Sequence, residues 1–274
     1  MKDPGAAAAS IERSVFDIFK VGVGPSSSHT MGPMLAARLF VLRLASEGLL
    51  ERTAEVYVRL YGSLALTGVG HCTDRAILLG LEGEEPATLD PAAMDPAIAR
   101  IRRESRIRLL GRHEIAFDEP MNLLFLRDQM LPRHPNGMRF AARDAGGATL
   151  LEEEMYSIGG GAVWREGEGP GGQGDASVAA LPFPFDSAAS LLAACHEHGL
   201  EIHELTLANE CVLRPRAEVD ARLATIWDVM QACVRRGFSA SGLLPGSLKV
   251  RRRAPRLQRV LESEDGAGRS DPME

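Results

Sequence analysis

A glycine-rich stretch at residues 165–180, REGEGPGGQGDASVAA, divides this 274-residue chain into two segments with different hydrophobic patterns. The stretch has no hydrophobic periodicity, and its glycines favour a linker over a helix or a strand. Before it, strand patterns and helix patterns are interleaved, whereas the pattern after it is helical throughout. We therefore predict a mixed α/β domain over residues 1–164, a linker over 165–180 and helices over 181–274.

Local patterns define the main elements. Residues 54–61, AEVYVRLY, alternate polar and apolar side chains, which predicts a half-buried strand. Residues 138–143 and 148–156 flank the turn signal DAGG, which predicts a hairpin. Helices are predicted from Pro33 and from the Asp-Pro turn at residue 90 through residue 111. The expected fold class is α+β, a mixed α/β N-terminal domain followed by a few helices that begin an all-α domain.

Composition excludes several classes of protein. The chain is 45% hydrophobic and 25% charged, as in globular proteins, and its formal charge of −6 argues against a chain-wide nucleic-acid interface. The four cysteines form no CxxC pair, and no spacing suggests a zinc site, so we expect no metal site and a reduced compartment. The N-terminus lacks a signal-peptide pattern, and no apolar run approaches the roughly 18 residues of a membrane span. We expect a cytoplasmic chain without nucleic-acid or membrane partners.

The segment Gly24–Thr30, GPSSSHT, precedes the helix predicted from Pro33. Its glycine lets backbone amides crowd together, its hydroxyls add hydrogen-bond donors, and the N-terminus of a helix favours negative charge. A bound carboxylate or phosphate would suit this pattern. A polar turn whose serine caps the helix would suit it as well.

The motif Gly70-His71-Cys72-Thr73-Asp74 follows the predicted strand, in the kind of loop where sites are commonly built. A histidine there is suited to act as a general base near neutral pH. The alternative is a helix start that Thr73 or Asp74 caps, with His71 simply hydrogen-bonded.

Two further motifs flank the predicted hairpin. HPNGM at residues 134–138 contains an Asn-Gly turn signal, although the amide of Asn136 could also orient a substrate carboxylate. YSIGGG at residues 156–161 allows either the close approach of a ligand or a flexible exit from the sheet.

Taken in order, five motifs resemble those of the iron–sulfur-dependent L-serine dehydratases (L-serine ammonia-lyases) of the single-chain bacterial type: FDIFKVGVGPSSSHTMGP, YGSLALTGVGHCTD, PNGM, YSIGGG and LPGSLKVRRRA. The resemblance implies an α/β domain, related to a serine-binding regulatory domain, followed by a helical catalytic domain. It implies a lyase of amino-acid catabolism and gluconeogenesis that converts L-serine to pyruvate and ammonia. It also implies a 4Fe–4S cluster whose open iron acts as a Lewis acid.

The resemblance assigns roles to individual residues. His71 and Thr73 would face the reacting serine, with His71 as the base. Six further residues would bind the substrate: Ser26, Ser27, Ser28, His29, Asn136 and Ser157. Of these, Ser26 to His29 would lie at the contact between domains, and the last two would hold the carboxylate or amino group of L-serine.

The chain departs from the family pattern in its cysteines. The cluster ligands of the family lie in glycine-rich motifs beyond the point where this sequence stops, and none of the four cysteines corresponds to them. We therefore expect a truncated portion that is inactive by itself, in a homo-oligomer or with a complementary chain that bears the cysteines. One alternative is an L-serine-binding regulatory or docking module without catalysis, and another is a non-functional gene product.

Overall fold

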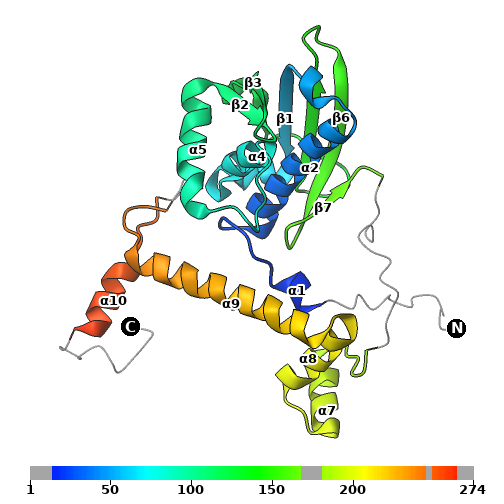
Figure 1. Ribbon diagram of the computed structural model, residues 1–274, viewed down its shortest axis with the longest axis vertical. Helices are drawn as coiled ribbons and strands as arrows, with labels where there is room; N and C mark the ends of the chain where they lie inside the picture. The colour runs from blue at the N-terminus through cyan, green and yellow to red at the C-terminus, as the bar shows by residue number, and fades with distance from the viewer. Residues whose placement is uncertain (1–13, 168–180, 245–248, 264–274) are drawn as a thin grey trace, which may run out of the picture. The chain divides into compact units, whose positions relative to one another are not determined.

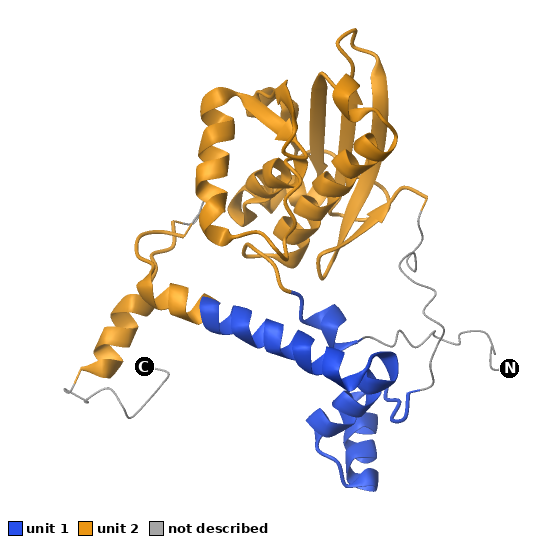
Figure 2. Ribbon diagram, in the orientation of Figure 1, with its two compact units in different colours: residues 1–20, 173–232 blue, residues 21–172, 233–274 orange. Residues whose placement is uncertain are grey.

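The computed structural model describes residues 14–167, 181–244 and 249–263 (Figure 1). The chain forms two compact units, one of residues 21–172 and 233–274 and the other of residues 1–20 and 173–232 (Figure 2). Most of the predicted linker, 165–180, lies outside the described residues, so the boundaries expected from the sequence stay a prediction.

The larger unit is built on a five-stranded mixed sheet with the strand order β4-β1-β5-β6-β7. The central pair is antiparallel, with Val58 of β1 opposite Phe140 of β5, whereas β4 runs parallel to β1. The predicted strand and hairpin are confirmed as β1 and as β5 with β6. The strands are β1 (Glu55–Tyr61), β4 (Leu123–Leu126), β5 (Gly137–Arg143), β6 (Thr149–Gly159) and β7 (Ala162–Arg165).

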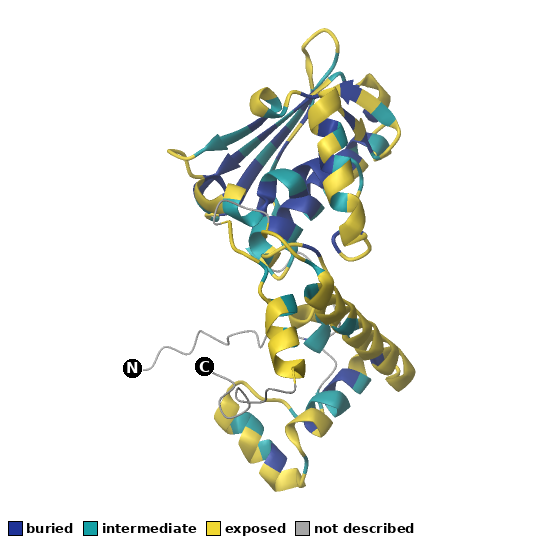
Figure 3. Ribbon diagram, turned by 90° about the vertical axis from the view of Figure 1, so that its left-hand side faces the viewer, coloured by how far each residue is buried: buried dark blue, intermediate teal, exposed yellow. Residues whose placement is uncertain are grey.

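Helices α2 (Gly32–Ser46) and α4 (Thr73–Leu81) pack together, and α2 also contacts the sheet through β6 and β7. Apolar residues recur along α2, so one stripe of the helix is buried. Phe40 of α2 stacks on Phe140 of β5 with ring centroids 5.3 Å apart. Figure 3 shows this core as the most buried part of the unit. The predicted helix at Pro33 is confirmed.

The helix predicted over residues 90–111 is too long. Helix α5 (Pro91–Glu104) is capped by the Asp90 side chain, and Ser105 then takes a left-handed backbone with a φ of 48°. This residue ends the helix, and β2 (Arg106–Leu109) pairs with β3 (His113–Ala116) in a separate two-stranded sheet. Tertiary pairing thus overrides the helical pattern of the last turns.

The other elements of this unit are short. They are the helical segments η1 (Ser27–Met31), η2 (Leu50–Arg52), α3 (Gly62–Thr67), η3 (Gly68–His71), α6 (Glu119–Asn122) and α10 (Ala254–Glu262).

The smaller unit is helical and contains α1 (Val15–Ile18), α7 (Ala188–His198), α8 (Ile202–Leu213) and most of α9 (Arg216–Ser239). Its buried carboxylate, Glu210, accepts hydrogen bonds from the Ser14 hydroxyl at 3.0 Å, from the Val15 amide at 2.6 Å and from Arg214 at 3.0 Å. Helix α9 keeps large apolar side chains such as Trp227 exposed. The fold class predicted from the sequence, α+β followed by helices, is confirmed.

Candidate active site

Four segments that the sequence singles out lie at one end of the inner strands β1, β5 and β6 of the five-stranded sheet. Strand β1 ends at Tyr61 and leads directly into α3, while β5 begins beside it at Gly137. The Ser63 amide donates to the Pro135 carbonyl at 2.8 Å, which ties the start of α3 to the turn before β5. Ser157 lies near the end of β6, next to that turn.

The serine-rich motif forms one wide turn of π-helix, η1, that continues into α2. The amides of Thr30 and Met31 both donate to the Ser26 carbonyl, at 3.0 and 3.2 Å. The Ser26 hydroxyl accepts from the His29 amide at 3.1 Å and therefore caps the turn. The capping alternative is thus present in the structure. π-turns are rare and are frequently found at functional sites.

The His29 ring has a hydrogen-bond partner at both nitrogens. Its Nδ1 lies 2.9 Å from the Ser28 hydroxyl, and its Nε2 lies 3.0 Å from the Ser63 hydroxyl. Ser63 belongs to the YGSLALTG motif, but the sequence analysis did not select it. The sequence gives no signal for Ser63, because its role depends on the contact of its hydroxyl with His29, which only the folded structure shows.

The His71 ring lies beside His29, with ring centroids 4.8 Å apart and planes tilted by 41°. Its Nδ1 is 2.9 Å from the Thr67 carbonyl. A carbonyl oxygen only accepts hydrogen bonds, so Nδ1 carries the proton in the neutral ring and Nε2 carries the lone pair. Among the described residues no side chain or backbone group occupies that Nε2, so this nitrogen is free to accept a proton.

The environment favours the neutral form of His29. Burial lowers the pKa of His29 below its ordinary value of 6.5, and the nearby His71 ring lowers it further, while a hydrogen bond to the Ser63 backbone partly offsets these effects. Two imidazoles at this separation disfavour a second proton on the pair.

The two threonines of the motifs are fully buried. The Thr30 hydroxyl donates to the His71 carbonyl at 2.8 Å, and the Thr73 hydroxyl donates to the His29 carbonyl at 2.5 Å. Helix α4 receives no side-chain cap from Thr73, and Asp74 instead pairs with Arg102 at 2.7 Å. The capping alternative is therefore not what the structure contains.

Asn136 and Ser157 lie side by side where β5 begins. The Asn136 side-chain amide donates to the Ser157 carbonyl at 3.0 Å, and the Ser157 amide donates to the Asn136 carbonyl at 3.1 Å. The Ser157 hydroxyl is buried without a hydrogen-bond partner among the described residues. It lies against α2, because a Cβ placed on Gly32 would be 2.0 Å from it. A buried hydroxyl without a partner carries a desolvation cost and so calls for an explanation.

The structure thus joins His29 to Ser63 and His71 and pairs Asn136 with Ser157, with Ser26 and Ser28 in the turn that contains His29, while Ser27 is exposed on the same turn. Gly159, Gly160 and Gly161 all have a positive φ and form the turn between β6 and β7. Their conformation accounts for the glycines without a ligand.

The cysteines do not fit an iron–sulfur cluster. Cys72 is buried, Cys195 lies on α7, Cys211 on α8 and Cys233 on α9. Burial raises the pKa of the Cys72 thiol, which opposes the thiolate form that binds iron. Across the described ranges, no three His, Cys, Asp or Glu side chains are grouped so as to hold a metal ion. We therefore derive no chemical step through a cluster.

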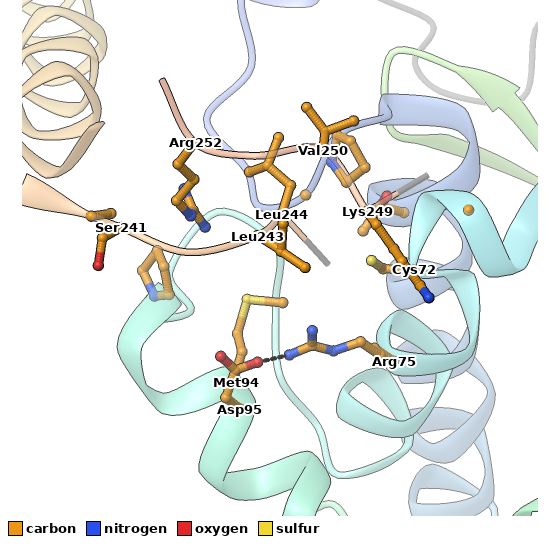
Figure 4. A pocket seen from close by; sticks show the side chains of 16 residues that line it. Cys72, Arg75, Met94, Asp95, Ser241, Leu243, Leu244, Lys249, Val250 and Arg252 are labelled. Carbon is orange, nitrogen blue, oxygen red and sulfur yellow. Dashed lines mark hydrogen bonds and ion pairs between the residues drawn. The ribbon is translucent and has the colours of Figure 1, made fainter. Parts of the chain in front are cut away.

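A cavity of about 840 Å³ adjoins the two histidine segments within the larger unit (Figure 4). Thr30 and Cys72 line it, together with the ion pair of Arg75 and Asp95 and with Lys249. None of the eight residues predicted for the site lines this cavity. The polar cluster around Ser63 is consequently separate from this cavity, although Thr30, the neighbour of His29 in the chain, lines the cavity.

Two family models match this chain. A family model described as the serine dehydratase beta chain matches residues 14–168, which is more than half of the chain and includes every site residue named above. The chain belongs to the serine dehydratase family. A second model, the serine dehydratase alpha chain, matches residues 197–269 of this serine dehydratase. The family inferred from the motifs is confirmed.

Curated relatives match over most of this serine dehydratase chain. An L-serine dehydratase of Streptomyces coelicolor is 48% identical over 251 residues, covering 92% of this chain and 55% of the relative. L-serine dehydratase 1 of Escherichia coli is 44% identical over 261 residues, covering 95% and 56%. The chain therefore spans about half the length of the curated relatives it matches. None of its described helices combines the length and the apolar character needed to cross a membrane.

Proposed function

We propose that this chain binds L-serine at the end of strands β1, β5 and β6 and supplies the base of an L-serine dehydratase, which converts L-serine to pyruvate and ammonia. The observation that carries the proposal is the state of His71. Its Nδ1 is committed to the Thr67 carbonyl, no described residue hydrogen-bonds its Nε2, and its ring lies 4.8 Å from that of His29. A general base needs such a fixed tautomer and an open nitrogen.

The remaining residues would bind and orient the substrate. Asn136 would hold the carboxylate or amino group of L-serine together with the Ser157 hydroxyl, which no described residue hydrogen-bonds, because both offer short polar groups where β5 begins. The hydroxyls of Ser26, Ser27 and Ser28, with His29, would form the other wall. Thr73 has no exposed surface, so it would support the site indirectly, through its hydrogen bond to the His29 carbonyl, without touching the substrate.

The chemistry divides into proton removal and loss of a hydroxyl. His71 Nε2 would take the proton from Cα, and the β-hydroxyl would leave with the electron pair of its bond, which yields aminoacrylate. This product rearranges to an imine that water hydrolyses to pyruvate and ammonia. Departure of hydroxide needs an acid.

The resemblance implies a 4Fe–4S cluster for that second task. The cysteines of this chain do not form its ligand set, so we expect a complementary polypeptide region to provide it. We propose that the chain alone binds L-serine without turning it over. After incubation with iron and sulfide, the purified chain should release no pyruvate, and robust turnover would refute this expectation.

Calorimetry with L-serine tests the binding step. Wild-type chain should bind L-serine in preference to D-serine. Asn136→Ala should weaken binding about tenfold, the effect of one lost hydrogen bond of about 1.4 kcal/mol. Ser46→Ala, an exposed serine on α2, serves as the matched control and should bind as wild type. Absence of L-serine binding in the wild-type chain, both alone and with its complement, would overturn the proposal.

Complementation tests the role of His71. The portion of the Streptomyces coelicolor relative that this chain does not match is added in trans with iron and sulfide. Pyruvate should form with wild-type chain but not with His71→Gln, although the variant should still bind L-serine. Equal turnover by His71→Gln would remove His71 from the role of base.

A second function is favoured because the described residues contain no cluster ligand set. A module that binds L-serine for regulation or docking would need the same polar cluster but no acid. Such a module would bind L-serine and give no pyruvate in the complementation assay, with His71→Gln indistinguishable from wild type.

A further inference from the structure

We propose that Thr30 and Thr73 are positioning residues that hold His29 and His71 side by side, each through a hydrogen bond to the backbone carbonyl of the other segment's histidine. The two bonds run in opposite directions between the segments: Thr30 to the His71 carbonyl at 2.8 Å, and Thr73 to the His29 carbonyl at 2.5 Å. We call these two residues the threonine pair. The inference concerns the site of the proposed function, and it rests on that function for the roles of His71 as base and of His29 in substrate binding.

The backbone explains why these carbonyls need outside donors. In an α-helix, the His29 carbonyl would accept from the residue four positions on, but that residue is Pro33, which has no N–H. The His71 carbonyl precedes the first bond of α4, which runs from the Ala76 amide to the Cys72 carbonyl. Cys72 itself has a left-handed backbone with a φ of 59°, which breaks the helical run after His71. A buried carbonyl without a donor is costly, and the threonine pair supplies one to each.

Two glycines make room for the threonine pair. A Cβ on Gly24 would be 2.3 Å from the Thr30 methyl carbon, and the φ of Gly24 is +88°. A Cβ on Gly68 would be 3.0 Å from the Thr73 hydroxyl. Each histidine segment therefore contains a glycine that lets a threonine approach the backbone. This packing gives the glycines of both motifs a role that needs no bound anion.

The consequence lies in the ring pair. Because each threonine bonds the backbone at a histidine, the two bonds together limit how far the His29 and His71 backbones can separate. The rings lie 4.8 Å apart, and His29 is also held at Ser28 and Ser63. Loss of either threonine hydroxyl should loosen this separation while leaving the sheet and α2 in place.

The test uses the full chain and needs no turnover. Thr30→Val and Thr73→Val remove the hydroxyls with little change in shape, and histidine ring NMR spectra are recorded across pH. The pKa of His29 is depressed by burial and by His71. In each valine variant the titration midpoint of His29 should therefore move toward 6.5, and the proton–proton contacts between the rings should weaken. Thr30→Ser and Thr73→Ser keep the hydroxyl and should retain the wild-type midpoint.

Thr53→Val is the matched control. Thr53 is also a buried threonine, and its hydroxyl donates to the Leu49 carbonyl at 3.0 Å, away from the histidines. This variant should lose stability but keep the His29 midpoint and the ring contacts. If Thr30→Val and Thr73→Val also keep the wild-type His29 midpoint and the ring contacts, the proposal is wrong.

Wild-type protein provides a test if the valine variants fail to fold. Buried hydroxyl protons that are hydrogen-bonded exchange slowly, so those of Thr30 and Thr73 should be visible in proton NMR spectra. Each should show a through-space contact to the Hα of the histidine that it bonds, His71 for Thr30 and His29 for Thr73. Failure to observe this contact for either threonine would overturn the proposal. Calorimetry distinguishes failure of the proposed function from failure of this inference. If the wild type does not bind L-serine, the proposed function is wrong, whereas the positioning role of the threonine pair is still tested by the NMR spectra of the histidine rings.

Discussion

Replacing Ser157 with alanine should stabilise the larger unit while weakening its binding of L-serine. The Ser157 hydroxyl is fully buried, and no described residue hydrogen-bonds it. The backbone of Gly32 packs so closely that a Cβ there would be 2.0 Å from this oxygen. The folded protein therefore bears the cost of desolvating a hydroxyl without gaining a bond in return.

The size of the effect follows from two opposing contributions. An unsatisfied buried hydroxyl costs about 1–3 kcal/mol. Removing the oxygen also forfeits several dispersion contacts of about 0.1–0.2 kcal/mol each, together roughly 1 kcal/mol. The net expectation for Ser157→Ala is a gain of about 1 kcal/mol in the free energy of unfolding, or a rise of about 2–4 °C in Tm for a unit of this size.

Urea unfolding followed by the fluorescence of Trp164 measures this gain. Trp164 lies on β7, opposite Tyr156 of β6, and so reports on the same sheet. A Trp227→Phe background removes the signal from α9. Thr53→Val is the comparison, because its buried hydroxyl has a partner, and it should lose about 1 kcal/mol.

A loss of 1 kcal/mol or more in Ser157→Ala would refute the reasoning, because it would mean that the hydroxyl has a partner in the free protein. The same variant should bind L-serine about tenfold more weakly if the hydroxyl serves the substrate. A more stable but less competent variant is the pattern expected when a binding group is held at a cost to the fold.

Three further predictions test other parts of the structure. Arg43→Met should lower the free energy of unfolding by about 2 kcal/mol in a urea titration, because it leaves the buried Glu153 carboxylate unpaired. The double variant with Glu153→Met should recover most of the loss, and a single variant as stable as wild type would contradict this account. Stability should fall as the pH drops below about 6.5, because the unfolded chain then binds a proton that folded His29 takes up only at lower pH. In His29→Gln the slope of stability against pH should decrease without vanishing, since burial also lowers the pKa of His134; an unchanged slope would argue against His29. Glu210→Ala should expose the amide of Val15 to hydrogen exchange at least tenfold faster, because that amide donates to Glu210 at 2.6 Å, and unchanged protection would show that another group holds α1.

Local patterns were sufficient for strands that alternate clearly or that flank a turn signal. The alternation of residues 54–61 predicted β1, and the DAGG turn predicted the pairing of β5 with β6. Strand β4 escaped prediction because its four apolar residues show no alternation, and its parallel pairing with β1 depends on a partner more than 60 positions away. The strand after Ser105 was missed for a different reason, because the basic and apolar spacing of residues 106–109 also suits a helix.

The sequence by itself determined the family and predicted most polar residues of the candidate site, because motif residues and their order can be read without coordinates. Only the tertiary structure decided how those residues act on one another. The partners of the His29 ring and of the two histidine carbonyls are 34, 41 and 44 positions away. Contacts across such separations depend on how β1, α2 and α4 pack. Local periodicity carries no information about which carbonyl a buried hydroxyl reaches.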